Sequence, residues 1–292
     1  MGVIAGEGGL GAGWGMRVSE LTVYPVKGCA GVALEQAELD SFGVRHDRRW
    51  MIARPDGDFV TQRGTPQLAL LETALEANAL VLRSRTAGEA RVPLAGPEGA
   101  APVRLVRIWD DVVEALDAGD EAADLVGRHL GAEGDGLRLV YMPDSTLRQV
   151  SPAHARPGDR VSFADGFPLL VVTQQSLDEL NRRLPEPVPM HRFRPNVVVD
   201  DAPSPHDEDT WRRIRLGSVP CDVVKPCARC VVTTVDQATA VAGVEPLRTL
   251  AAYRRQDGLV WFAQNAIHRA TGWLAVGDDV EVLERGEPRP AL

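Results

Sequence analysis

Two cysteines three residues apart, Cys227 and Cys230, are the residues whose spacing most clearly suggests chemistry. Such a pair can supply half of a structural zinc site, a redox-active dithiol, or a single thiolate for a softer metal. A fourth interpretation is that both are buried and act only as small apolar side chains. The residues around the pair favour some of these possibilities over others.

A redox dithiol requires its first cysteine at a helix N-terminus, where the thiol pKa is lowered. Residues 228–236 are instead rich in Val and Thr, and we predict a strand there. Structural zinc requires four ligands, and the remaining cysteines, Cys29 and Cys221, are not spaced as a second pair. His191 or His206 would have to complete the set, so zinc stays an alternative.

Several basic residues are predicted at strand ends or in the turns beside them. They are Lys27, Arg48, Arg63, Arg194 and Arg229. Arginine forks bind dense anions such as phosphate. The chain as a whole is acidic, with a formal charge of −9, which argues against a nucleic-acid partner. A soft thiolate beside a local cationic pocket indicates an anionic cofactor that carries a soft metal.

The elements that must position these residues are mostly strands. The many short β-branched segments between Gly and Pro residues predict an α+β fold that is mainly β, with two β-barrel-like domains and a few short helices. We predict helices at 117–131, ending at Gly131, from a capping box at Ser176–Glu179 to Pro185, and at 245–255.

The 292 residues suggest about two domains. We predict a flexible tail at 1–15, domains at 16–140 and 141–286, and a C-terminal tail at 287–292. No apolar run approaches the ~18 residues of a membrane span, and no secretory signal is recognisable. We therefore expect a cytoplasmic protein with no membrane partner.

Several blocks in order along the chain resemble the MOSC family of molybdenum-cofactor proteins. They include "YPVKGCAG", "HDRRW", "FADGFPL", "RFRPNVVVD" and "KPCARCVVTTVD", and the resemblance runs from about Leu21 to Leu283. It is to the two-domain branch, an N-terminal β-barrel domain followed by a MOSC domain, which includes mitochondrial amidoxime-reducing components and bacterial N-hydroxy reductases.

The resemblance implies a molybdenum–pterin cofactor (Mo-molybdopterin), with Cys230 as catalytic residue and protein ligand of the metal. The residues that match cofactor contacts of the family are Lys27, Gly28, Arg48, Asp165, Gly166, Arg194, Asn196, Ala228 and Arg229. Gly28 stands where relatives have serine, and Gly166 and Phe167 replace two hydroxyl residues. Cys227 is expected to be a buried structural thiol. Pyridoxal phosphate binding is a further association of the family.

The implied activity is an oxidoreductase that reduces small N-hydroxylated compounds to the amine or amidine, using two electrons and two protons and releasing water. The sequence has no dinucleotide fingerprint, and no cysteine follows Cys230 to bind an iron–sulfur cluster. We therefore expect a separate electron donor, either a ferredoxin-like protein or a b-type cytochrome with its reductase. A sulfur carrier (sulfurtransferase) in cofactor metabolism and a zinc-stapled binding protein remain alternatives.

Overall fold

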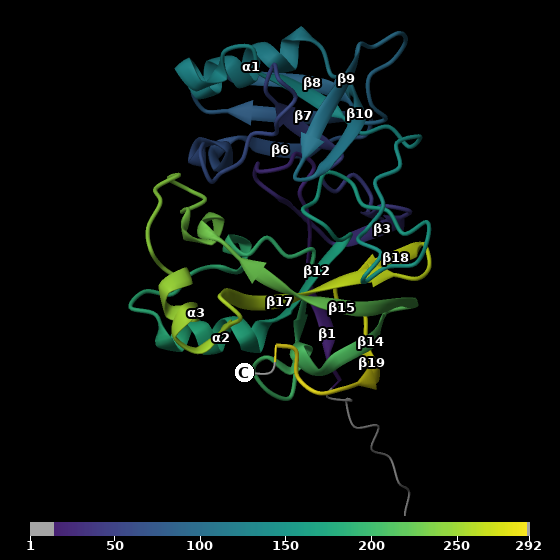
Figure 1. Cartoon of the computed structure of the whole chain (residues 1–292), viewed down its shortest axis with the longest axis vertical. Helices are drawn as coiled ribbons and strands as arrows, with labels where there is room; N and C mark the ends of the chain where they lie inside the picture. The colour runs from purple at the N-terminus through teal and green to yellow at the C-terminus, as the bar shows by residue number, and fades with distance from the viewer. Residues whose placement is uncertain (1–14, 291–292) are drawn as a thin grey trace, which may run out of the picture.

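The computed structural model describes residues 15–290, in which strands predominate and three short helices occur (Figure 1). The predicted fold class, mainly β with a few short helices, is confirmed. The predicted tail at 1–15 lies almost entirely outside the described residues.

Within residues 15–290 the largest sheet has nine strands, and its only parallel pair there is β12–β13. In spatial order its strands are β19 (Val280–Arg285), β14 (Trp211–Leu216), β15 (Val219–Arg229), β17 (Leu259–His268), β12 (Leu169–Thr173), β13 (Val197–Asp200), β1 (Arg17–Val23) and β2 (Val32–Leu34), with β16 (Arg255–Gln256) on β17. The central strands β12 and β13 are continuous apolar runs, as expected where both faces of a sheet are covered.

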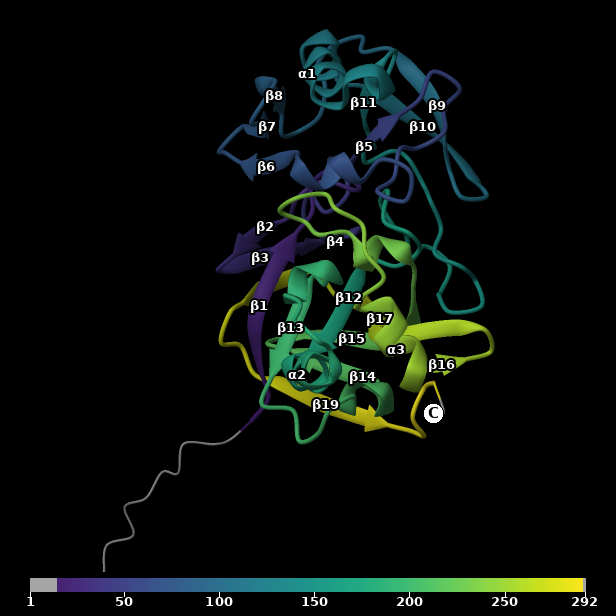
Figure 2. The same ribbon diagram turned by 90° about the vertical axis from the view of Figure 1, so that its left-hand side faces the viewer.

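Three smaller sheets complete the β-structure. The first contains β5 (Trp50–Ala53), β11 (Arg138–Tyr141), β10 (Asp111–Asp117) and β9 (Val103–Ile108). The second contains β18 (Gly272–Ala275), β3 (Gln36–Asp40) and β4 (Gly43–Val44), and the third β6 (Glu72–Leu75), β7 (Ala79–Ser84) and β8 (Gly88–Pro93). Figure 2 shows the first and third of these sheets with α1 at one end of the molecule and the nine-stranded sheet at the other.

The helices are α1 (Asp120–Leu130), α2 (Gln174–Arg183) and α3 (Leu247–Tyr253). All three fall where the sequence predicts them. α1 has acidic residues in its first turn and basic residues in its last, which complements the helix dipole, and Gly131 follows it with φ of 60°. α2 and α3 pack together against one face of the large sheet, over a core that contains Phe193 and Phe262.

The first strands of the chain pair with the last ones. β1 is hydrogen-bonded to β13, and β3 is hydrogen-bonded to β18. In Figure 1 the purple strand β1 accordingly lies among the green strands of the second half. The division near residue 140 remains a proposal, and the structure adds that strands from before this point complete the sheet formed after it.

Two local predictions are wrong. The strand predicted at 228–236 ends at Arg229, and Val231–Thr234 form a 3-10 turn. There the Thr233 and Thr234 hydroxyls donate to the carbonyls of Cys230 and Val231, and such local bonds compete with strand pairing. The capping box is displaced: α2 begins at Gln174, and its N-cap is Thr173, whose hydroxyl accepts from the Ser176 N–H.

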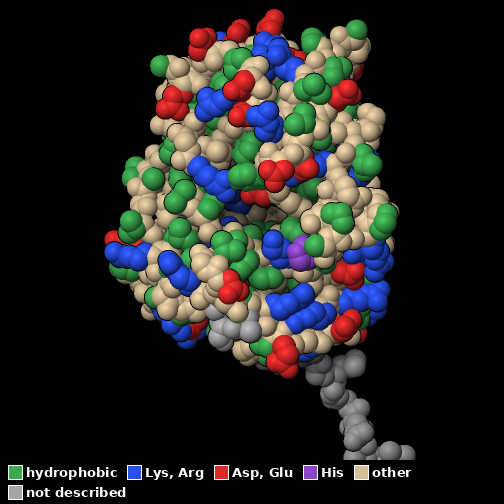
Figure 3. Space-filling view, in the orientation of Figure 1, with side chains coloured by type: hydrophobic (Ala, Val, Ile, Leu, Met, Phe, Trp, Pro, Cys, Tyr) green, Lys and Arg blue, Asp and Glu red, His purple; other side chains and the backbone are tan. Residues whose placement is uncertain are grey.

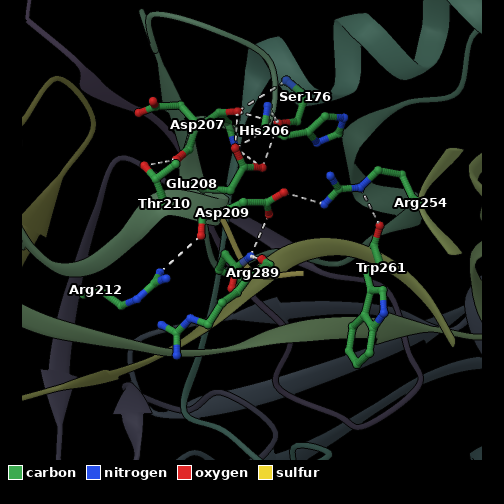
Figure 4. Close-up of polar contacts among 12 residues, drawn as sticks. Ser176, His206, Asp207, Glu208, Asp209, Thr210, Arg212, Arg254, Trp261 and Arg289 are labelled. Atoms are coloured by element: carbon green, nitrogen blue, oxygen red, sulfur yellow. Dashed lines mark hydrogen bonds and ion pairs between the residues drawn. The ribbon is translucent and has the colours of Figure 1, made fainter. Parts of the chain in front are cut away.

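A cluster of buried acidic side chains joins α2 to the large sheet (Figure 4). The Glu208 carboxylate accepts hydrogen bonds from the hydroxyls of Thr173 and Ser176 at 2.7–2.9 Å. Asp209 accepts from Arg254 and Gln264, each at 2.7 Å. Burial, and then the charge of Asp209, raise the pKa of Glu208 to about 7.

Candidate functional site

Cys230 follows the last residue of β15, with its thiol half-buried. The Arg63 guanidinium, from the turn after the β5 hairpin, donates a hydrogen bond to its sulfur at 3.5 Å. Arg63 belongs to the set of basic residues that the sequence singles out. The thiol therefore faces a cation that comes from the other part of the chain.

Three adjoining cavities form one cleft around this thiol. The thiol cavity is lined by Cys230, Lys27, Arg63 and Trp109, among others. The cationic cavity is lined by Arg48, Arg194, Asn196 and Arg229, among others. The aromatic cavity is lined by Trp109, His154 and Phe167, among others. Asp165 and Cys227 line all three. Figure 3 shows the surface hollowed between the two parts of the molecule, with basic and acidic side chains at the rim.

Every residue predicted for the site lines this cleft. They are Lys27, Gly28, Arg48, Asp165, Gly166, Arg194, Asn196, Ala228, Arg229 and Cys230. The structure thus brings together residues from positions 27 to 230 of the chain. Their individual roles as cofactor contacts remain predictions.

Arg48 and Arg194 lie against the ring of Tyr24, with their guanidinium carbons 4.3 and 4.2 Å from its centroid. Both have left-handed backbones, with φ of 47° and 56°. Conformations of this kind are costly for a residue with a side chain and tend to occur at functional sites. Arg48 is held by Asp47 at 2.6 Å, whereas Arg194 donates to the carbonyl of Cys29 at 2.7 Å.

Two buried guanidinium nitrogens of the cleft have no hydrogen-bond partner among residues 15–290. They are Nη2 of Arg194 and Nε of Arg229. A buried donor without an acceptor costs free energy. Burial and the neighbouring Arg48 charge also lower the pKa of Arg194 to about 10. A bound anion would satisfy both donors and reverse this electrostatic cost, so the donor set fits an anionic cofactor such as the molybdenum–pterin group.

Lys27 is buried, and its ammonium lies 2.5 Å from a carboxylate oxygen of Asp165. Burial lowers the pKa of Lys27, and Asp165 offsets part of that effect. Desolvation in the cleft opposes ionisation of Asp165, but Lys27 outweighs it, so the pKa of Asp165 lies below its ordinary value. The two groups therefore form a charged pair across the cleft.

Both polar atoms of the Asn196 side-chain amide form hydrogen bonds within the protein. Its oxygen accepts from Arg48 at 3.3 Å and from the Leu170 N–H at 3.2 Å, and its nitrogen donates to the Thr22 carbonyl at 3.2 Å. In this structure Asn196 therefore orients Arg48.

Gly28 has φ of 84°, and an added Cβ would lie 3.1 Å from a Leu68 methyl group. This backbone favours glycine at position 28.

Sequence reasoning missed Arg148 and Trp109. Arg148 is buried, and its guanidinium donates to the carbonyls of Ser162, Ala164 and Asp165 at 2.5–3.1 Å, which fixes the loop that carries Asp165. It lies in a segment that reads as a polar linker, so no local signal marked it. Trp109, in the turn between β9 and β10, follows an alternating strand and gives no signal for a site.

The expectation that Cys227 is buried is wrong. Its thiol is half-buried in the cleft, and Arg229 donates to its sulfur at 3.0 Å. Cys29 and Cys221 are the buried thiols, and burial raises the pKa of each to about 12. Across residues 15–290 no three His, Cys, Asp or Glu side chains come together as possible metal ligands, so Cys227 and Cys230 find no further protein ligands for zinc there.

No helix of the part that the structure describes is long and apolar enough to cross a membrane.

Both parts of the chain match models of known domain families. Residues 15–133 match the MOSC N-terminal beta barrel domain, and residues 158–281 match the MOSC domain. The chain is 32% identical to mitochondrial amidoxime-reducing component 1 of Mus musculus, over 91% of this chain and 82% of that protein. It is 35% identical to mitochondrial amidoxime reducing component 2 of Homo sapiens, over 82% of this chain and 73% of that protein. With both domains in order around the cleft, this chain belongs to the MOSC family, in the branch of the amidoxime-reducing components.

Proposed function

We propose that this protein is an oxidoreductase that reduces N-hydroxylated compounds at a molybdenum–pterin centre in the cleft. The observation that carries the proposal is that Cys230 lines the same connected cavities as Arg194 and Arg229. Each of these arginines has a buried nitrogen without a hydrogen-bond partner in the part of the chain that the structure describes. The names of the relatives support the substrate class, because those proteins are named for amidoxime reduction.

Each group would have a distinct task. Cys230 would supply the thiolate ligand, since soft sulfur suits a soft metal. Arg194 and Arg229 would donate to the anionic part of the cofactor with the nitrogens that lack partners, and Arg48 would add a charge that Asp47 and Asn196 hold in place. When bound, the molybdenum–pterin group would supply the two-electron redox chemistry that none of these side chains provides.

Electrons would come from a separate ferredoxin-like protein or a b-type cytochrome with its reductase. Pyridoxal phosphate binding remains only an association of the family. The proposed compartment is the cytoplasm, and the names of the relatives give the mitochondrion as the alternative. All four cysteines are free thiols, which suits a reducing environment.

The test is metal and pterin analysis of protein purified from a molybdenum-replete host, for the wild type, Cys230→Ser and Cys221→Ala. Wild type and Cys221→Ala should carry molybdenum near one per chain, because the buried Cys221 does not line the cleft. Cys230→Ser should lose both the metal and amidoxime reduction with a chemical reductant. Molybdenum retained by Cys230→Ser would contradict the proposal. A persulfide on Cys230 without stable molybdenum would support the sulfur-carrier alternative.

A further inference from the structure

The aromatic cavity adjoins the cationic cavity, and the basic residues that line the aromatic cavity are Arg148 and Lys225. It is not lined by Arg48, Arg194, Asn196 or Arg229. It shares Trp109, Asp165, Cys227 and Ala228 with the thiol cavity, which contains Cys230. A molecule in the aromatic cavity would therefore approach the thiol from the Trp109 side, away from Arg48, Arg194, Asn196 and Arg229. Of the predicted cofactor contacts, Asp165, Gly166 and Ala228 also line this cavity.

Trp109 lies at this junction and packs against Phe59. Its backbone is left-handed, with φ of 56°, which is unusual for a large side chain and costs conformational energy. Phe59 packs edge-on against its indole, with ring centroids 5.0 Å apart at 69°. The side chain nonetheless remains 39% exposed, so part of the indole is open to a ligand.

Arg63 links this indole to the reacting centre. Its guanidinium carbon lies 4.5 Å from the Trp109 ring centroid, while one of its nitrogens donates to the Cys230 sulfur. Arg63 thus contacts both the indole and the Cys230 sulfur.

A second aromatic group lines the same cavity. Phe167 and His154 lie with ring centroids 5.9 Å apart at 62°. Burial and nearby positive charges lower the pKa of His154, which favours its neutral ring. The cavity therefore offers the Trp109 indole and the Phe167 ring as apolar surfaces. Contacts with such rings stabilise the binding of flat conjugated groups.

We propose that Trp109 is a specificity-determining residue that makes the aromatic cavity select N-hydroxylated substrates carrying an aryl group over those carrying an alkyl group. This inference rests on the proposed function. The aryl ring would lie against Trp109, and its N–O group would point through the junction toward Cys230. Trp109 touches the substrate body and takes no part in the redox step.

The experiment compares a phenyl and a methyl amidoxime as substrates of the holoenzyme, in the wild type, Trp109→Leu, Trp109→Phe and Phe167→Leu. Trp109→Leu should lower the phenyl-to-methyl ratio of kcat/KM about fivefold to tenfold, mainly through KM for the phenyl compound, since the lost contact is made in the ground state as well. Trp109→Phe should restore most of the ratio. Phe167→Leu should lower it too, which provides a second variant if Trp109→Leu does not fold.

The control is Trp273→Leu on β18, an exposed tryptophan (58%) that lines none of the three cavities, and it should leave the ratio unchanged. A second readout, free of turnover, is the calorimetric affinity for benzamidine against acetamidine, which should follow the same order of variants. An unchanged ratio in Trp109→Leu and Phe167→Leu, or equal losses for both substrates, would overturn the proposal. If the wild type reduces neither compound, the proposed function fails, and the affinity ratio alone decides whether Trp109 selects aryl ligands.

Discussion

At Arg194 a single guanidinium makes two contacts and keeps one donor unused. One nitrogen donates to the Cys29 carbonyl, the guanidinium carbon lies over the Tyr24 ring, and the other terminal nitrogen has no partner among residues 15–290. Lysine would keep the charge but lose the planar fork. Arg194→Lys should therefore retain far less cofactor, with an affinity lowered about tenfold to a hundredfold for the loss of a charge-assisted hydrogen bond. Molybdenum per chain after extensive dialysis is the measurement.

The matched control for Arg194→Lys is Arg213→Lys on β14, which changes an arginine that lines none of the cleft cavities. It should retain cofactor as the wild type does. Equal retention in both variants would show that charge alone, without the fork, holds the anion.

The two thiols of the Cys-x-x-Cys pair should respond differently to substitution. Cys230→Ser should abolish amidoxime reduction, because a hydroxyl does not replace a thiolate on a soft metal at neutral pH. Cys227→Ser should keep its molybdenum and change the free energy of unfolding by less than about 1 kcal/mol, because this thiol is half-buried rather than in the core. Metal content and urea unfolding separate the two effects. Loss of metal in both variants would favour a dithiol site.

At the scale of elements, the segment around α2 makes stability depend on pH. The pKa of Glu208 is raised to about 7 in the folded protein, against 4.5 ordinarily, so the folded state binds more protons between these values. Stability from this group is therefore full below pH 4.5 and is lost as the pH rises through 7. Glu208→Gln should remove this slope, so its stability relative to the wild type should increase by up to about 2–3 kcal/mol from pH 5 to pH 8.

Urea unfolding of both proteins at several pH values measures this difference. His206 has an opposite effect, because burial lowers its pKa to about 3, but it is present in both proteins and cancels in the comparison. A difference that stays constant with pH would mean that Glu208 keeps an ordinary pKa.

Elements with local signals could be predicted from the sequence. Helix α1 is marked by its apolar face, Leu125, Val126 and Leu130, and by Gly131, and the hairpin of β14 and β15 by alternation around Gly217. The end of β15 could not be predicted, because it depends on threonine hydroxyls that bond to nearby carbonyls. The motif residues were found through family blocks. Arg148 and Trp109 were missed, since their contacts join segments that are distant in sequence.

At the scale of the whole molecule, the cleft draws residues from both parts of the chain, so a bound anion should stabilise both together. Cofactor-loaded protein should unfold at a higher temperature than cofactor-free protein, by several degrees if ligand at 100 times its Kd adds about 2.7 kcal/mol. Scanning calorimetry of the two forms measures this. Identical transitions, or a shift in only one of two resolved transitions, would argue against a ligand that spans the cleft.

The pairing of β1 with β13 and of β3 with β18 has a consequence for synthesis on the ribosome. Residues 36–40 leave the ribosome early, yet their partner strand ends at residue 275. Because domains generally fold as they emerge, the edge of β3 that pairs with β18 stays open until almost the whole chain has been translated, and β1 lacks β13 until residue 200 has emerged. Cys230 and its cations can meet only after residue 230 has been translated, so products truncated before this point could not sequester a scarce cofactor.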